Sequence, residues 1–410
     1  MNEIKVSSTF PFQIVEWPNV LGSIGLGRHS ITHEEVFIKE YCFSSLADEA
    51  NLLNVSSGGI GIPVLHWCGS VNGKEVMVTD TYGPSLEDLF SQSGRYFSFK
   101  TLIEFADQLL ARVEFIHSRK IIHGDLSPWS FAMGNPGWQS QQILLVDFAT
   151  KAEANTSALD DLHAIGQILM YFYSGASSWE LFQQAKDCEK DTAPAFARFH
   201  RAVRSCRKIN YNMLRSIFRD AYEDLTFNLA VALDLYGPRA ITYGPLSRMG
   251  SSSPGANSGC DFQSLNTELS HAGRLLEGTG PLSKSNSVEL LASLDKITEL
   301  YSALLHRDRA IERGGHITNS YALPNRLWRD LRWILEGTRE GPACCRLAVV
   351  GKCYKFIGVL YEAIPSYRVY WVKYLLTIAR IQREIEPPCS KSPWTQNMYY
   401  WQDIYDSLQS

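Results

Sequence analysis

Four short segments of the chain carry residue types that could handle phosphate groups. Lys39 follows the β-like run 36–38, and Glu49 stands ten residues later in a helical stretch. In a phosphoryl-transfer site, such a lysine holds the α- and β-phosphates of a nucleotide and pairs with a glutamate on a helix. Asp125 ends the motif His123-Gly124-Asp125, and Asp147 follows an apolar run. A single lysine at the end of a strand is usually only solvated, but the four segments together have the order and spacing that phosphoryl transfer needs.

The sequence between these segments resembles casein kinase I. The resemblance covers residues 12–227 and is carried by these runs: Gly58-Gly59-Ile60-Gly61-Ile62-Pro63, Trp67-Cys68-Gly69, Gly83-Pro84-Ser85-Leu86-Glu87-Asp88-Leu89-Phe90, Ala106-Asp107-Gln108 and Asp160-Asp161-Leu162. It implies an α+β, bilobal protein kinase-like fold with ATP and Mg²⁺ in the cleft between the lobes.

The resemblance also implies a role for each candidate residue of the reaction. Asp125 matches the aspartate that accepts the proton of the substrate hydroxyl, and Lys39 and Glu49 match the catalytic ion pair. Asp147 matches the magnesium-binding aspartate, and Ser130 occupies the position of the second metal ligand, an asparagine in the family.

The implied nucleotide contacts lie nearer the N-terminus. Gly25 and Gly27 match the glycine loop, Thr79 the gatekeeper position, and Asp80 and Tyr82 the hinge that contacts adenine. Ser30 replaces the third glycine of the loop, so the hairpin over the phosphates is expected to be short and to hold ATP weakly.

Several departures from the family pattern predict poor catalysis. Gly124 replaces an arginine, Ser127 a lysine and Ser130 an asparagine. Each lost contact to metal or γ-phosphate would cost about 2–4 kcal/mol of transition-state stabilisation, by analogy with other electrostatic donors. Two such losses would slow the reaction by several orders of magnitude.

The activation segment is missing. Only 14 positions separate Asp147 from Asp161, and they span at most about 50 Å when extended. That length connects two elements but forms no docking platform for a protein substrate. An incomplete gene model would produce the same short interval.

The chain is expected to divide into three parts. A kinase-like domain covers residues 10–235, a linker 236–283, and an α-helical interaction domain 284–410. Of the 17 residues 244–260, eleven are Gly, Pro or Ser, so this stretch has too little apolar surface to fold alone. Leu290, Leu294 and Ile297 recur at helical spacing, which predicts the first helix of an all-α bundle. The further helices of this bundle are expected to begin near residues 324, 343 and 365. The two halves are therefore expected to be independently stable.

A weaker resemblance concerns the C-terminal part. Residues 356–380 are similar to the 14-3-3-like helical region of telomerase-associated and nonsense-mediated-decay factors, which implies phosphopeptide or ribonucleoprotein partners. Arg326, Arg329 and Arg332 could line a phosphate-binding groove, although a solvated helix face is the simpler interpretation.

Composition excludes other classes of function. The formal net charge of −4 gives no basic field, so direct binding to nucleic acid is not expected. No apolar run approaches the roughly 18 residues of a membrane span, and residues 1–10 lack the features of a signal peptide. The nine cysteines are scattered without a CxxC motif, which is typical of reduced thiols in an intracellular protein, cytoplasmic or nuclear.

These observations predict a casein kinase I-like pseudokinase that binds ATP weakly and acts as a scaffold or regulator of a protein partner through its helical domain. One alternative is an active serine/threonine kinase. Another is a phosphopeptide or ribonucleoprotein adaptor in which the kinase fold is passive.

Overall fold

The computed structural model describes residues 10–16, 24–41, 46–71, 73–148, 156–184, 193–233, 264–265, 267–271, 286–310, 322–386 and 391–409. They form an α+β protein with two compact units. The first, here called the sheet–bundle unit, lies within Met1–Thr81, Asn135–Ser140 and Pro254–Ser410. The second, the helical unit, lies within Tyr82–Gly134 and Gln141–Ser253.

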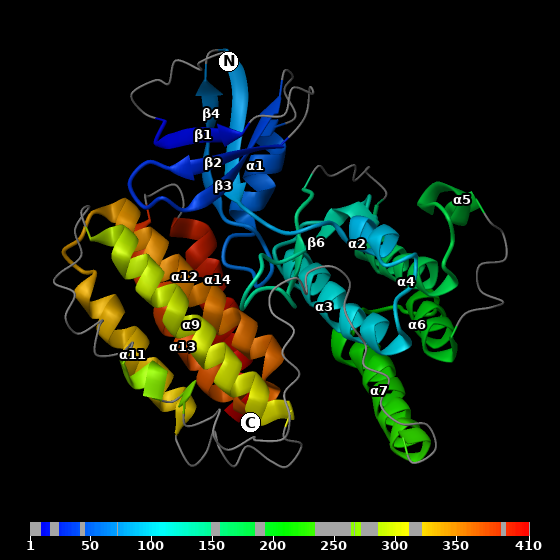
Figure 1. Ribbon diagram of the computed structural model, residues 1–410. Coiled ribbons are helices and arrows are strands. Elements are labelled where there is room, and N and C mark those ends of the chain that lie inside the picture. Colours follow the sequence, from blue (N-terminus) through cyan, green and yellow to red (C-terminus); the bar gives the residue numbers. More distant parts are fainter. Residues whose placement is uncertain are drawn as a thin grey trace. The chain divides into compact units, whose positions relative to one another are not determined.

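The sheet–bundle unit begins with a five-stranded antiparallel sheet of order β1-β2-β3-β5-β4 and one helix (Figure 1). Their bounds are β1 Phe12–Glu16, β2 Ile24–His29, β3 Glu35–Tyr41, α1 Leu46–Val55, β4 Leu65–Val71 and β5 Lys74–Asp80. Val36, Ile38, Val76 and Val78 alternate along β3 and β5 and are buried in one apolar cluster of the sheet. The predicted β-like run 36–38 lies inside β3 and is confirmed, whereas β2 and β4 had not been predicted.

The same unit contains the C-terminal helices, which lie side by side in Figure 1. They are α9 Ser287–Ala310, α11 Leu323–Gly337, α12 Ala343–Ala363, α13 Arg368–Ile385 and α14 Lys391–Gln409, with a short 3-10 turn at Pro365–Tyr367. The predicted apolar stripe of α9 is confirmed, because Leu290, Leu294 and Ile297 are all buried in the bundle core. The pattern had not predicted α14.

The bundle packs against the sheet rather than standing apart from it. Ile31, Ile60 and Trp138 pack on the bundle core, and the Tyr354 hydroxyl donates a 2.7 Å hydrogen bond to the Gly58 carbonyl. The two halves were expected to be independently stable, whereas these contacts join the bundle to the sheet. The reason lies in α12, which is apolar around most of its circumference and so needs a partner on more than one side.

The predicted linker 236–283 lies mostly outside the described residues. Within it, however, residues 267–271 are helical. Leu269 is buried in the bundle core, and the Ser270 hydroxyl accepts a 2.8 Å hydrogen bond from Arg326. Part of the segment expected to be a free linker thus packs on the bundle.

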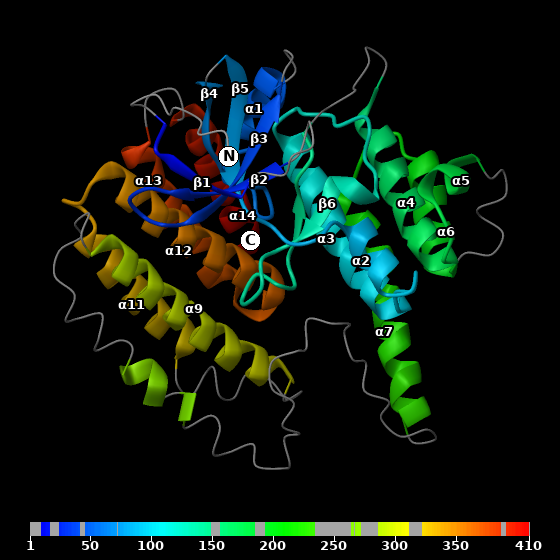
Figure 2. The ribbon, with the colours of Figure 1, turned by 45° about the horizontal axis from the view of Figure 1, so that its top comes forward.

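The helical unit is built around α3, which packs against α4 and α7, while α4 packs against α6 (Figure 2). Its elements are α2 Leu86–Gln92, α3 Phe99–Ser118, a 3-10 turn Pro128–Ser130, β6 Phe131–Met133, β7 Ile143–Leu145, α4 Ala158–Ser174, α5 Trp179–Gln184, α6 Pro194–Arg204 and α7 Tyr211–Leu233. Capping boxes at Ser85 and Ser157 begin α2 and α4 by satisfying backbone N–H groups that a helix leaves unpaired.

Across the described ranges, the helices are all too short or too polar to cross a membrane.

Candidate functional site

Lys39 and Glu49 form a partly buried ion pair within the sheet–bundle unit. The ammonium nitrogen of Lys39 lies 2.7 and 2.8 Å from the two carboxylate oxygens of Glu49. The Lys39 side chain is 19% exposed and that of Glu49 5%. Val36 and Ile38 face the apolar cluster of the sheet, so the alternation of β3 turns Lys39 to the opposite face, toward α1. The pairing predicted from their spacing is present.

Gly25 and Gly27 do not lie in a turn. Both are inside strand β2, where Gly25 pairs with Ile38 and Gly27 with Val36 of β3. A Cβ atom on Gly27 would come within 2.4 Å of Ile38 Cδ1, so this glycine is explained by close packing inside the sheet. Residues 24–29 are thus a strand, and the nucleotide contact expected of Gly25 and Gly27 stays a prediction. The connection between β1 and β2, residues 17–23, lies outside the described residues.

Asp161 anchors the segment around Asp125 in the helical unit. Its carboxylate accepts hydrogen bonds of 2.8 Å from the backbone N–H groups of His123 and Gly124. His117 Nε2 also lies 2.8 Å from this carboxylate, which is 1% exposed. Asp161 therefore supports the backbone of this segment. Gly124 has φ 78°, a left-handed conformation that favours glycine.

His123 links this segment to Asp147, which follows strand β7. His123 Nε2 lies 2.8 Å from the Asp147 carbonyl oxygen, and the His123 ring is fully buried. The Asp125 side chain is exposed. The structure thus brings Asp125, Asp147 and Ser130 into one region of the helical unit.

Ser130 fits poorly as a metal ligand. Its side chain is completely buried, and its hydroxyl oxygen accepts a 3.1 Å hydrogen bond from the Ser127 backbone N–H. The Ser127 hydroxyl lies 3.3 Å from the same oxygen. This serine closes the turn at Pro128–Ser130. Within the described ranges, no group of three or more His, Cys, Asp or Glu side chains could hold a metal ion.

The Asp80 side chain is committed to the bundle. Its carboxylate lies 2.7 Å from Lys355 of α12 and 2.8 Å from His66 of β4, and it accepts a 2.8 Å bond from the Val64 backbone N–H. Although burial alone would raise the pKa of Asp80, the charge of Lys355 and the hydrogen bond from His66 hold it below its usual value. The neighbouring Thr79 is buried, and its hydroxyl donates to the Asp80 carbonyl at 3.3 Å.

The predicted residues are divided between the two units. Lys39, Glu49 and Thr79 belong to the sheet–bundle unit together with the two glycines and Asp80, whereas Tyr82 belongs to the helical unit with Asp125, Ser130 and Asp147. Contacts within the sheet–bundle unit form the Lys39–Glu49 ion pair, and contacts within the helical unit anchor the segment around Asp125.

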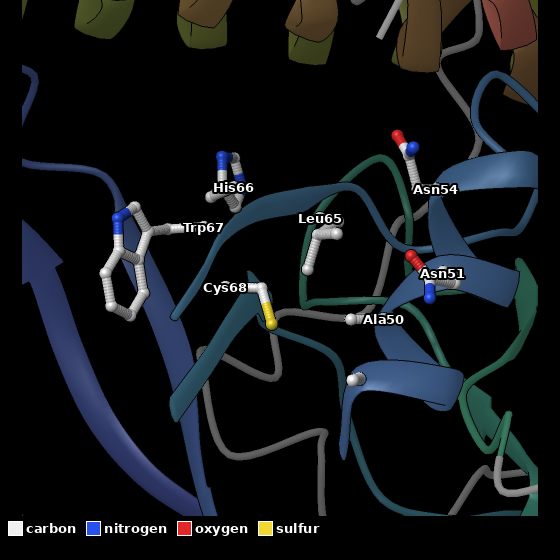
Figure 3. Close-up of a pocket in the computed structure, with 8 residues that line it drawn as sticks. Ala50, Asn51, Asn54, Leu65, His66, Trp67 and Cys68 are labelled. Atoms are coloured by element: carbon white, nitrogen blue, oxygen red, sulfur yellow. The ribbon is translucent and has the colours of Figure 1, made fainter. Parts of the chain in front are cut away.

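A pocket of about 290 Å³ lies between α1 and β4 (Figure 3). It is lined by Ala47, Ala50, Asn51, Asn54, Leu65, His66, Trp67 and Cys68. Successive residues turn by about 100° around a helix, so Ala47, Asn51 and Asn54 share a face that Glu49 does not. The pocket is therefore separate from the Lys39–Glu49 pair.

The arginines of α11 have local partners. Arg329 lies 3.0 Å from the carboxylate of its neighbour Asp330, and Arg332 lies 2.8 Å from Glu336 one turn later. Arg326 bonds Ser270. These pairs agree with a solvated helix face and give no support to a phosphate groove. Trp371 and Trp401 are buried in the bundle core.

Sequence reasoning missed the residues that join the bundle to the sheet. Tyr354, Lys355 and Asn397 had no expected role, and Gly58 was noted only as part of a resemblance. Gly58 has φ +81° and lies against Asn397 and Trp394, which the sequence alone does not show. No protein-family model matches the chain.

Proposed function

We propose that this chain is a casein kinase I-like pseudokinase with a bilobal fold, which contacts the phosphates of ATP through Lys39 and transfers none of them appreciably. Its work is then to bind and scaffold a protein partner, with the helical bundle as the scaffold.

The Lys39–Glu49 pair carries this proposal. Taking a carboxylate and an ammonium out of water costs several kcal/mol per ion, and apolar replacements of buried pairs are often neutral or stabilising. The bidentate contact at 2.7 and 2.8 Å holds one ammonium group in a fixed place, which is the requirement for anchoring a phosphate. The antiparallel sheet with α1 between β3 and β4 agrees with the same proposal.

The state of Ser130 argues against transfer. A metal ion at this position would need an oxygen that is accessible, whereas the Ser130 hydroxyl is buried and bonded within its own turn. Since the residues present do not fit a second metal ligand there, no catalytic step is assigned to magnesium.

The alternative of an active kinase has one observation in its favour. Asp125 is exposed on a segment that Asp161 anchors through two backbone bonds, and a proton acceptor needs that combination of access and rigidity.

Nucleotide binding is tested by thermal unfolding of the full chain with increasing ATP. Ligand at about ten times its dissociation constant stabilises the folded state by about 1.4 kcal/mol, so a measurable rise in melting temperature is expected. Lys39→Met should remove the rise. Lys74→Met, which changes an exposed lysine of β5, is the matched control and should retain it. No rise in the wild type would refute nucleotide binding.

Transfer is tested with radiolabelled ATP and casein or an acidic phosphorylated peptide. No incorporation above background is expected. Incorporation that disappears in Asp125→Asn would refute the pseudokinase proposal and establish the active-kinase alternative.

A further inference from the structure

The loop that follows α1, residues 56–64, is covered by two helices of the bundle. The hydroxyl of Tyr354 on α12 donates to the Gly58 carbonyl at 2.7 Å. The same hydroxyl oxygen accepts bonds from Asn397 Nδ2 at 2.7 Å and Trp401 Nε1 at 2.6 Å, both on α14. A Cβ atom on Gly58 would lie 2.3 Å from Asn397 Nδ2, so the helix and the loop are in close contact here.

The other end of this loop is held by an ion pair. Asp80 accepts the 2.8 Å bond from the Val64 backbone N–H, and the same carboxylate pairs with Lys355 of α12 at 2.7 Å. Between the two ends, Ile60 lies against Gly358, whose Cβ would be 3.1 Å from Ile60 Cγ1. Little more than one turn of α12 therefore contacts the start and the middle of this loop directly, and holds its end through Asp80.

This loop continues directly from α1. The Ser56 backbone N–H donates to the Leu52 carbonyl at 3.0 Å, which extends the helical bonding of α1 into the loop. Glu49 lies on α1, less than two turns before its end. A helix of 10 residues is marginal on its own, so the orientation of α1 depends on what holds its two ends.

We infer that the face of α12 formed by Tyr354, Lys355 and Gly358 is an intramolecular positioning surface for α1, and through α1 for the Lys39–Glu49 pair. The bundle then sets how far Glu49 stands from Lys39, and detaching it releases the pair. The nucleotide part of this inference rests on the function proposed above, but the orientation of α1 does not.

The test is a steric wedge in the full chain. Gly358→Leu places a side chain against Ile60, whereas a Cβ atom on Gly351 of the same helix would meet no atom within 4 Å, so Gly351→Leu is the matched control. Hydrogen exchange of the α1 amides reports the opening of that helix. We expect exchange about tenfold faster in Gly358→Leu and unchanged in Gly351→Leu. The double variant Gly358→Leu/Ile60→Ala, which makes room for the wedge, should recover most of the protection.

ATP affinity is the second readout. A wedge that leaves one fifth of the molecules competent lowers the apparent affinity about fivefold, while the control keeps it. If the wild type binds no ATP, the proposed function fails and the exchange of α1 alone decides the inference. Should Gly358→Leu not fold, Tyr354→Phe replaces it with the same expected increase in exchange. Unchanged protection of α1 in these variants, or equal loss in the control, would overturn the inference.

Discussion

A single oxygen atom, the hydroxyl of Tyr354, is expected to stabilise the sheet–bundle unit by more than one hydrogen bond usually does. It has three partners, namely the Gly58 carbonyl at 2.7 Å, Asn397 Nδ2 at 2.7 Å and Trp401 Nε1 at 2.6 Å. The residue is buried in the bundle core, so water cannot easily replace the lost atom. Tyr354→Phe removes the oxygen and keeps the ring.

The magnitude follows from the groups that would be left unpaired. Each buried donor or acceptor without a partner costs about 1–3 kcal/mol. Three partners lose one contact each, and partial relaxation of the Asn397 amide lowers the total, which gives about 3–5 kcal/mol. For a unit of about 150–250 residues, that corresponds to a fall in melting temperature of about 6–20 °C.

Tyr374→Phe is the matched control. Tyr374 belongs to the same core and is equally buried, but its hydroxyl has only two contacts, both at 3.4 Å, with Pro324 and Asn325. Bonds of that length are weak, so the control should lose less than about 1 kcal/mol. The measurement is urea unfolding followed by far-ultraviolet circular dichroism, with equal slopes required for the comparison. Equal losses in the two variants would refute the reasoning.

Three other predictions concern single contacts. Asp161→Asn exchanges one of the two accepting carboxylate oxygens for an NH2 group, which cannot accept a backbone bond, and it should destabilise the helical unit by about 1.5–3 kcal/mol in urea unfolding; an unchanged midpoint would contradict this anchor. Lys355→Met should cost about 1–3 kcal/mol at pH 7, because it leaves the carboxylate of Asp80 without its main cation. Since the pKa of Asp80 is held below its usual value, the ionised carboxylate stabilises the wild type fully above about pH 4, and this stabilisation is lost as the pH falls further. The free energy of unfolding of Lys355→Met should therefore fall less in acid than that of the wild type. Parallel pH profiles of the two proteins would argue against the pair. Gly27→Ala places a methyl group 2.4 Å from Ile38 Cδ1 and should cost about 1–3 kcal/mol by overpacking, part of which Ile38→Val should restore in the double variant; no recovery would show that another contact is responsible.

The elements with the clearest periodicity could be predicted from the sequence. Leu290, Leu294 and Ile297 repeat at helical spacing, and all three are buried in α9. Strands β2 and β4 could not be predicted in the same way. Their sequences, IGLGRH and LHWCGSV, contain glycines that favour turns locally, and pairing with β3 and β5 decides their conformation instead.

Helix α14 was missed for a related reason. Its sequence is rich in polar and aromatic residues, and the buried residues are Pro393, Trp394, Asn397 and Trp401. The burial of an asparagine makes sense only once Tyr354 is beside it, since its amide donates to the tyrosine hydroxyl. A contact between residues 43 positions apart leaves no periodic trace in either segment.

In the candidate site too, a contact between residues close in the sequence was predicted, and a contact between residues far apart in the sequence was not. Lys39 and Glu49 lie on successive elements, and the four-segment pattern together with the resemblance predicted a pair that the structure contains. The contact between Tyr354 and Gly58 joins residues 296 positions apart. Nothing in either segment predicts the other, and the bundle was therefore expected to stand alone.

In the proposed function, binding and transfer depend on different units. Three departures from the kinase pattern, Gly124, Ser127 and Ser130, lie in the helical unit, where Ser130 is buried in its own turn, whereas Ser30 lies in the sheet–bundle unit. The ion pair of Lys39 and Glu49 also lies in the sheet–bundle unit, on the helix whose following loop the bundle holds. Apolar replacements of buried ion pairs are often neutral or stabilising, so the presence of this pair supports the function proposed above. In that function the ammonium of Lys39 contacts a phosphate, which requires none of the residues replaced in the helical unit.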